Sequence, residues 1–272
     1  MAKIKANGIE LYYEIHGEGE PVVLLEGLGY SLWMWYKQVD VLSKHFKVII
    51  FDNRGVGESD KPDEEYSIEL FADDTAELLA ALNINKANIL GVSMGGFIAQ
   101  QFAIKYPEMV NKLILCSTSF GGTNSIPIPE ETLNLMFKGG GKYDSIEDIK
   151  EVIETALNKD NVEKNNDVLN KIIEEKIKTP QPKYAYQRQL MAGASFNAEE
   201  KVNKIKAETL IMAGKKDRVV PYENTLLLNE RIPNSRVEII ENGGHVFFME
   251  ESEISNKLII DFLMCQDLDD IY

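Results

Sequence analysis

The feature that most constrains the fold is a series of short apolar runs separated by helical patterns. The runs occupy residues 21–25, 48–51, 87–90, 113–116, 209–212 and 237–240. Most of them lack an alternation of polar and apolar side chains, which is typical of parallel strands covered on both faces. Helical patterns fall between them, at residues 31–44, 68–82, 94–106, 222–231 and 251–264. We therefore expect an α/β fold with a mostly parallel central sheet and helices on both faces.

One segment near the start of the chain has a different pattern. Residues 9–15 alternate between apolar and polar side chains, which is typical of a strand with one buried face. The letters HGEGEP follow at residues 16–21 and are rich in turn-forming residues. They predict a hairpin-like connection to the next strand.

The alternation of strands and helices is interrupted between Phe120 and Phe196. No buried-strand run occurs there, and helical patterns instead occupy residues 145–158 and 165–178. Three consecutive glycines at residues 139–141 predict a hinge.

This interruption suggests how the chain is divided. We expect a core domain of residues 1–122 and 196–272, with a helical cap of residues 123–195 inserted into it. A helical insertion over a parallel sheet is interpreted as a lid on the substrate side. A total length of 272 residues suits one large α/β unit of this kind.

The net charge of the chain argues against two classes of binding partner. The chain has 29 Lys and Arg against 44 Asp and Glu, a net charge of −15. Nucleic acid and anionic membrane surfaces would be repelled, so neither is an expected partner. No window approaches the roughly 18 uninterrupted apolar residues that cross a bilayer, and the first ten residues lack the apolar run of a signal peptide. We expect a cytoplasmic monomer or homodimer that acts on a small molecule.

The sequence offers no cofactor or metal motif. Cys116 and Cys265 lie in apolar surroundings without disulfide or zinc spacing, and are interpreted as small buried side chains. The glycine-containing segment FDNRGVGES at residues 51–59 is not G-x-G-x-x-G, and no helical pattern begins on it. We therefore expect no cofactor.

A candidate nucleophile lies at the end of the apolar run 87–90. The letters GVSMG place Ser93 between Gly91 and Gly95, and a helical pattern starts at once. G-x-S-x-G between a strand and a helix is the setting that gives this motif its meaning, because the sharp turn exposes the serine hydroxyl. The alternative is a serine in an ordinary glycine-rich turn.

A reactive serine needs a base, and only three histidines are available. His16 precedes the first strand connection, and His45 ends a helical pattern. His245 follows the apolar run 237–240, at the edge of an open α/β sheet where catalytic groups gather. His245 is therefore the predicted base, with a structural turn histidine as the alternative.

An acid must orient the imidazole and stabilise its charged form. Asp217 follows the run 209–212 and is therefore expected at the same sheet edge. The order Ser93, Asp217, His245 is the order of the triad on this kind of strand–turn–helix elbow. A helix-capping role is the alternative for Asp217.

These residues lie within five ordered motifs. They read LLEGLG, FDNRGVGESDKP, GVSMGG, GKKDRVVP and NGGHVFFME. With them the chain resembles the α/β-hydrolase superfamily over nearly its whole length. Within that superfamily it is most similar to carboxylesterases and 3-oxoadipate enol-lactonase-like hydrolases, the latter also through QLMAGASFNAEEKVNKIKAETLIMAG.

The resemblance implies an oxyanion hole made by the backbone N–H groups of Leu28 and Met94. One departure stands out, because relatives usually carry His-Gly where this chain has Glu26-Gly27. Glu26 could alter the charge preference for substrate or the pKa of a neighbour. We favour the alternative that it pairs with a cation such as Arg54 and braces the loop, since a negative charge beside an oxyanion would oppose catalysis.

The walls of the substrate pocket are harder to identify from sequence. Candidates that could line an acyl or ring pocket are Trp33, Trp35, Phe120, Phe137, Val219 and Val246. Each of them could equally serve core or lid packing.

The function expected from these residues and this resemblance is hydrolysis of a small carboxylic ester or lactone through an acyl-enzyme. A perhydrolase, in which peroxide replaces water, and a carbon–carbon bond hydrolase would use the same triad. Haloalkane dehalogenases and epoxide hydrolases are disfavoured, because these families need an aspartate where Ser93 stands. A non-catalytic receptor is disfavoured because all three triad residues are present.

Overall fold

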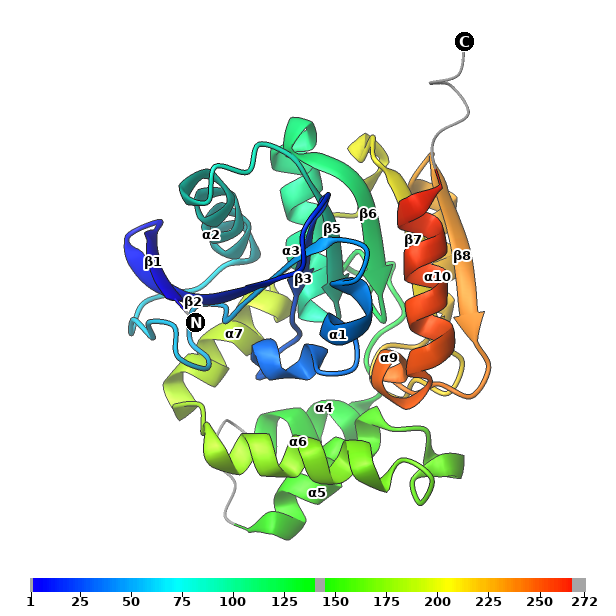
Figure 1. Cartoon of the computed structure of the whole chain (residues 1–272). Coiled ribbons are helices and arrows are strands. Elements are labelled where there is room, and N and C mark those ends of the chain that lie inside the picture. Colours follow the sequence, from blue (N-terminus) through cyan, green and yellow to red (C-terminus); the bar gives the residue numbers. More distant parts are fainter. Residues whose placement is uncertain (1, 140–144, 266–272) are drawn as a thin grey trace.

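The computed structural model describes residues 2–139 and 145–265. An eight-stranded sheet crosses the molecule in the order β1-β2-β4-β3-β5-β6-β7-β8 (Figure 1). The strands are β1 (Ala2–Ala6), β2 (Ile9–His16), β3 (Pro21–Leu25), β4 (Lys47–Phe51), β5 (Ala87–Val92), β6 (Val110–Cys116), β7 (Glu208–Gly214) and β8 (Ser235–Ile240). All pairs from β4 to β8 along this order are parallel, whereas β1–β2 and β2–β4 are antiparallel. The predicted α/β class and every apolar strand run are confirmed.

The hairpin expected after β2 is wrong. Strand β2 does not pair with β3, which instead lies between β4 and β5 and is covered on both sides. The hairpin joins β1 to β2, through Asn7 and Gly8 at φ angles of 46° and 82°. Positive φ at both positions is the geometry of the tight two-residue turn that Asn-Gly favours. The Asn-Gly pair is therefore the sequence signal from which this turn could have been predicted.

Helices cover both faces of the sheet. On one face lie α2 (Ile68–Ala81), α3 (Met94–Lys105) and α8 (Glu223–Arg231), and on the other lie α1 (Val39–Leu42), α9 (Phe247–Glu250) and α10 (Ser252–Met264). The helix expected over residues 31–44 is only a 3-10 turn, Leu32–Trp35, followed by the single turn α1. Buried Gln38 lies between them and donates from Nε2 to the Phe248 carbonyl oxygen at 2.6 Å, which attaches this segment to α9.

Four helices lie between β6 and β7 in the described part of the chain. They are α4 (Glu130–Gly139), α5 (Ile146–Ala156), α6 (Asn166–Lys178) and α7 (Lys183–Ala194). Helices α4, α5 and α6 lie together beyond one end of the sheet, and α7 leads back towards it (Figure 1). The sequence pattern indicated α5 and α6 but not α4 or α7. The predicted glycine hinge lies mostly outside the described residues, because only its first glycine, Gly139, falls within them.

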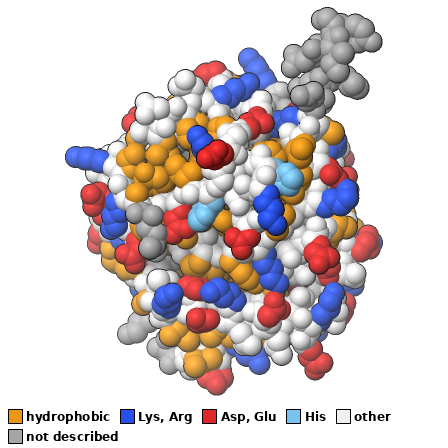
Figure 2. Space-filling view, viewed as in Figure 1, with side chains coloured by type: hydrophobic (Ala, Val, Ile, Leu, Met, Phe, Trp, Pro, Cys, Tyr) orange, Lys and Arg blue, Asp and Glu red, His pale blue; other side chains and the backbone are white. Residues whose placement is uncertain are grey.

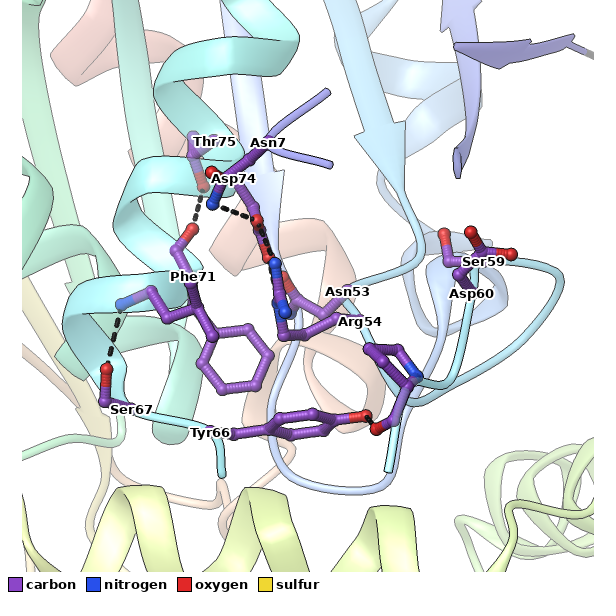
Figure 3. Close-up of polar contacts among 12 residues, drawn as sticks. Asn7, Asn53, Arg54, Ser59, Asp60, Tyr66, Ser67, Phe71, Asp74 and Thr75 are labelled. Atoms are coloured by element: carbon purple, nitrogen blue, oxygen red, sulfur yellow. Dashed lines mark hydrogen bonds and ion pairs between the residues drawn. The ribbon is translucent and has the colours of Figure 1, made fainter. Parts of the chain in front are cut away.

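A buried ion pair joins three separate segments of the chain (Figure 3). Arg54, in the loop after β4, donates from Nε and Nη2 to the two carboxylate oxygens of Asp74 on α2, both at 2.6 Å. The side chain of Asn7, in the β1–β2 turn, also donates to Asp74 at 2.8 Å. Arg54 and Asp74 are completely or almost completely buried, so each charge depends on the other for its stabilisation.

The surface carries charges of both signs. Acidic and basic side chains are interspersed over the described part of the face in Figure 2, without a continuous basic area. No helix among residues 2–139 and 145–265 is long and apolar enough to cross a bilayer. Cys116 is buried as expected, but Cys265 is exposed just after α10, so its interpretation as a buried side chain is wrong.

Candidate active site

Ser93 lies at a strained turn between β5 and α3. Its backbone has φ 57° and ψ −118°, which a residue other than glycine rarely adopts. A Cβ atom on Gly95 would lie 2.1 Å from the Leu25 carbonyl oxygen, and one on Gly91 would lie 2.1 Å from the Gly95 carbonyl oxygen. Only glycine fits at either position, so the two glycines allow β5, β3 and α3 to approach closely enough to form this turn.

The turn lies where the order of the strands changes direction. From β3 the chain continues to β4 on one side, and the later strands β5 to β8 extend the sheet on the other side. The loops after β3 and β5 meet here, because a Cβ atom on Gly27 would lie 3.3 Å from Ser93 Cβ. In open α/β sheets this edge is where ligands bind.

His245 and Asp217 meet at the same edge. Asp217 follows β7 and His245 follows β8, and His245 Nδ1 lies 2.9 Å from Asp217 Oδ2. The other carboxylate oxygen of Asp217 accepts from the backbone N–H groups of Val219 at 2.7 Å and Val220 at 2.9 Å. Because an ionised carboxylate only accepts, this contact puts the imidazole proton on Nδ1 and leaves Nε2 able to accept one.

Ser93 and His245 line one cavity. In the part of the chain that the structure describes, no hydrogen bond joins the Ser93 hydroxyl to His245. Long or unformed catalytic hydrogen bonds are common in sites without substrate, so this geometry is compatible with proton transfer in a complex.

The buried side chain of Glu250 on α9 joins the loop that carries His245 to the segment between α5 and α6. Glu250 Oε2 accepts from Gly244 N at 2.6 Å, and Oε1 accepts from Asn158 N at 2.7 Å and Asn165 Nδ2 at 3.2 Å. Desolvation raises the pKa of Glu250 to about 7. Sequence reasoning missed this residue, although it is the last letter of the NGGHVFFME motif.

Leu28 and Met94 are the residues whose backbone N–H groups are expected to form an oxyanion hole. Both residues line a second cavity together with Ser93. Within the described residues neither N–H group has a hydrogen-bond partner. Two unpaired donors next to a nucleophile are what an oxyanion hole requires.

The expected pairing of Glu26 with Arg54 is wrong, because Arg54 is held by Asp74. Glu26 is completely buried; its Oε1 accepts from Asn53 N at 2.6 Å, and its Oε2 has no partner among the described residues. Desolvation, followed by the nearby Asp52, raises the pKa of Glu26 well above its ordinary value. Burial therefore favours the protonated form of Glu26, whose side chain braces the loop through Asn53.

This protonation state predicts a pH dependence of stability. In the unfolded chain Glu26 ionises near its ordinary pKa of 4.5, whereas in the folded chain it keeps its proton to higher pH. The folded state therefore binds more protons above about pH 4.5, and the free energy of unfolding falls as pH rises. Glu26→Gln keeps the contact with Asn53 and removes this fall. In urea unfolding, the stability of the variant relative to the natural protein should increase between pH 5 and pH 8.

Glu26→Ala provides the comparison for the same experiment. It leaves Asn53 N unpaired in the core and should cost about 1–3 kcal/mol relative to Glu26→Gln at every pH, because neither replacement side chain titrates. An equal pH slope for the natural protein and Glu26→Gln would show that Glu26 is ionised in the folded state.

Two cavities meet at Ser93. The smaller has a volume of about 80 Å³ and includes His245, and the larger has a volume of about 270 Å³ and does not. Leu28, Met136 and Val219 line both of them.

The predicted pocket residues divide between these cavities and the core. Val219 lines both cavities, Val246 the smaller and Phe137 the larger. Three others line neither: Trp35 and Phe120 are completely buried in the core, and Trp33 packs beside Tyr30 with ring centroids 5.3 Å apart. Wall residues that the sequence did not indicate include Tyr30, Met136, Lys176 and Tyr186. No local signal could identify them, because their positions depend on how the helices between β6 and β7 fold over the sheet.

Residues that could hold a metal are not grouped in the described part of the chain. Among residues 2–139 and 145–265, no three His, Cys, Asp or Glu side chains are close enough to share an ion. The polar side chains at this edge are the hydroxyl of Ser93, the imidazole of His245 and the carboxylate of Asp217.

Comparison with known proteins identifies the family of the chain. The profile of a family described as alpha/beta hydrolase fold matches residues 20–252. The chain is 31% identical to a poly(3-hydroxyalkanoate) depolymerase from Ectopseudomonas oleovorans, over 89% of this chain and 84% of the relative. It is 30% identical to a 2-hydroxy-6-oxo-6-phenylhexa-2,4-dienoate hydrolase from Comamonas testosteroni, over 93% of this chain and 91% of the relative. Among solved structures, the enol-lactonase from Burkholderia xenovorans LB400 is 28% identical and superposes with a TM-score of 0.85, covering 97% of this chain and all of that one.

Proposed function

Because the chain belongs to the alpha/beta hydrolase fold family and is a hydrolase, we propose that it cleaves a small carboxylic ester or lactone through an acyl-enzyme on Ser93. The observation that carries this proposal is the contact of 2.9 Å between His245 Nδ1 and Asp217 Oδ2, beside a serine at a strained strand–helix turn. A base oriented by an acid, next to an exposed hydroxyl, is the arrangement that activates a serine.

The reaction would proceed in two halves. Ser93 Oγ attacks the carbonyl carbon while its proton passes to His245 Nε2, and the oxyanion binds the N–H groups of Leu28 and Met94. The bond from carbonyl carbon to leaving oxygen then breaks, and His245 gives its proton to that oxygen. In the second half, His245 takes a proton from water, which attacks the carbonyl carbon of the acyl-enzyme. The bond from that carbon to Ser93 Oγ then breaks, and His245 gives its proton to Oγ, which releases the acid and free Ser93.

We propose that residues 123–195 act as the lid of this site. Met136 on α4, Ile153 on α5, Lys176 on α6 and Tyr186 on α7 all line the cavity that contains Ser93 and His245. A cover formed by four helices would exclude water and select the substrate by shape.

A second candidate is hydrolysis of a carbon–carbon bond on the same residues. It is favoured by the similarity to the Comamonas testosteroni relative, which is named as a dienoate hydrolase. The two candidates differ in substrate and not in the residues that we assign.

Covalent labelling together with a substrate panel tests the proposal. A fluorophosphonate probe should add once, at Ser93, because it reacts with an activated serine. The panel should include short p-nitrophenyl esters, lactones, ring-cleavage products and peracid formation, and we expect turnover of an ester or lactone. Labelling without turnover of any panel member would favour a binding protein, and labelling at another serine would exclude Ser93 as the nucleophile.

A further inference from the structure

A lysine of the lid lies in the cavity of the catalytic residues. Lys176 on α6 lines the smaller cavity with Ser93 and His245. Its side chain is half-buried, and Nζ donates to the Gly29 carbonyl oxygen at 3.0 Å. Nζ also lies 4.6 Å from the centroid of the Tyr30 ring. The ammonium group is thus held at the wall of the site next to the oxyanion loop.

This positive charge has no acidic partner among the residues that the structure describes. None of the described residues that line the smaller cavity is Asp or Glu, and no described carboxylate forms an ion pair with Lys176. By contrast, Lys171 on the same helix pairs with Glu175 at 2.7 Å. In a chain with 44 acidic residues, an unpaired and partly desolvated ammonium is unusual.

Lys176 is nevertheless charged when the protein works near neutral pH. Desolvation lowers the pKa of Lys176 to about 8, which still leaves most molecules protonated at pH 7. A charge taken partly out of water without a counter-ion costs free energy that an anionic ligand would recover.

The two cavities differ in the groups that a substrate would meet. The larger cavity has mostly apolar walls, and its described lining has no charged side chain. These walls include Phe97, Ile128, Leu133 and Phe196. The smaller one contains both Lys176 and His245. Since His245 must protonate the leaving oxygen, the leaving group belongs in the smaller cavity and the acyl group in the larger one.

We propose that Lys176 binds the carboxylate of the leaving group, so that the preferred substrate is an apolar acyl ester of a short hydroxy acid. This inference rests on the proposed function and adds to it the chemical class of substrate. The cavity volume of about 80 Å³ limits the hydroxy acid to a few carbons, whereas the other cavity of about 270 Å³ takes a medium acyl chain. A charge-assisted hydrogen bond between ammonium and carboxylate would also fix the ester oxygen near His245.

A pair of esters with matched shapes tests this. Carboxymethyl hexanoate and isobutyl hexanoate share the acyl group, and their leaving groups, glycolate and isobutanol, have the same branching but differ in charge. We expect kcat/KM to be higher for carboxymethyl hexanoate. Lys176→Met should lower kcat/KM for this ester about 10- to 100-fold more than for isobutyl hexanoate, the worth of one hydrogen bond to a charged group. Lys176→Arg should keep most of the preference, because the charge remains.

Lys178→Met is the matched control, because Lys178 is an exposed lysine on the same helix and lines neither cavity. It removes the same charge and should leave the ratio of kcat/KM for the two esters unchanged. A ratio that falls equally in Lys178→Met would mean that the net charge of the lid, and not Lys176, sets the preference.

Other outcomes overturn the inference in distinguishable ways. Equal losses for both esters in Lys176→Met would mean that Lys176 only braces the oxyanion loop through Gly29. A preference that appears only for isobutyl hydrogen succinate, with its carboxylate on the acyl side, would reverse the assignment of the cavities. Turnover of isobutyl hexanoate without any charge preference would overturn this inference and leave the proposed function intact. No turnover of any of the three esters would also overturn this inference, and the proposed function would fall only if the p-nitrophenyl esters and lactones of the panel were not hydrolysed either.

Discussion

Replacing Ser93 with alanine should lower kcat/KM for a short p-nitrophenyl ester by about 10⁴- to 10⁶-fold. The variant keeps the strand–helix turn and loses only the hydroxyl that would form the acyl-enzyme. His245, Asp217 and the two backbone donors remain, so a small residual rate is expected from binding and oxyanion stabilisation. Steady-state kinetics at saturating and sub-saturating ester, with far-UV circular dichroism as a check on folding, measure the effect.

Ser43→Ala is a suitable control. Ser43 follows α1 and its side chain makes no hydrogen bond among the described residues, so this variant should keep full activity. Unchanged turnover in Ser93→Ala would overturn the acyl-enzyme mechanism and, with it, the roles assigned to His245 and Asp217. Loss of the fluorophosphonate adduct in the same variant would support Ser93 as the labelled residue.

Replacing Asp74 with leucine should cost about 3–5 kcal/mol of the free energy of unfolding. The substitution leaves the Arg54 guanidinium buried without the two hydrogen bonds of 2.6 Å that Asp74 provides (Figure 3). It also removes the acceptor for Asn7, which loosens the β1–β2 turn. Urea unfolding followed by tryptophan fluorescence measures the loss.

A second acidic partner of Arg54, which is exposed, provides the comparison. Glu64 also contacts Arg54, at 2.7 Å, but its side chain is 54% exposed, so Glu64→Gln should cost less than about 1 kcal/mol. The double variant Arg54→Met with Asp74→Leu should recover much of the loss, because no charge is then left buried. If Asp74→Leu and Glu64→Gln cost the same, the buried pair does not contribute as argued.

The fold followed from patterns of residues that are close in the sequence. Runs without polar alternation, such as residues 113–116, could only be central strands, and the structure confirms them. Some errors concern elements, such as the missed helices α4 and α7, and others concern which segments pair. The strand at residues 9–15 was correct, but its hairpin lies towards β1 and not towards β3, because β3 is the strand that is buried between two parallel neighbours.

For the candidate site as well, the sequence predicted some features correctly and others wrongly. Ser93, Asp217 and His245 were chosen because each follows a predicted strand, and the ends of parallel strands meet at one edge. Their catalytic roles stay predictions, but their placement at this edge is what the sequence indicated. Glu26 was assigned the wrong partner, since the sequence does not reveal that Arg54 is already held by Asp74.

The sequence by itself determined the apolar strands, the class of fold and the placement of Ser93, Asp217 and His245 after strands that end at one edge of the sheet. All three follow from the spacing of residues along the chain. Apolar residues form short runs between helical patterns, and glycines lie two positions before and two positions after Ser93. Only the tertiary structure decided what surrounds Ser93. Tyr30, Lys176 and His245 are far apart in the chain and reach one cavity because α6 packs over the loops after β3 and β8. The charge state of Glu26 and the unpaired ammonium of Lys176 depend on the same packing, because desolvation and the lack of a partner are properties of the folded surroundings and not of the residue type.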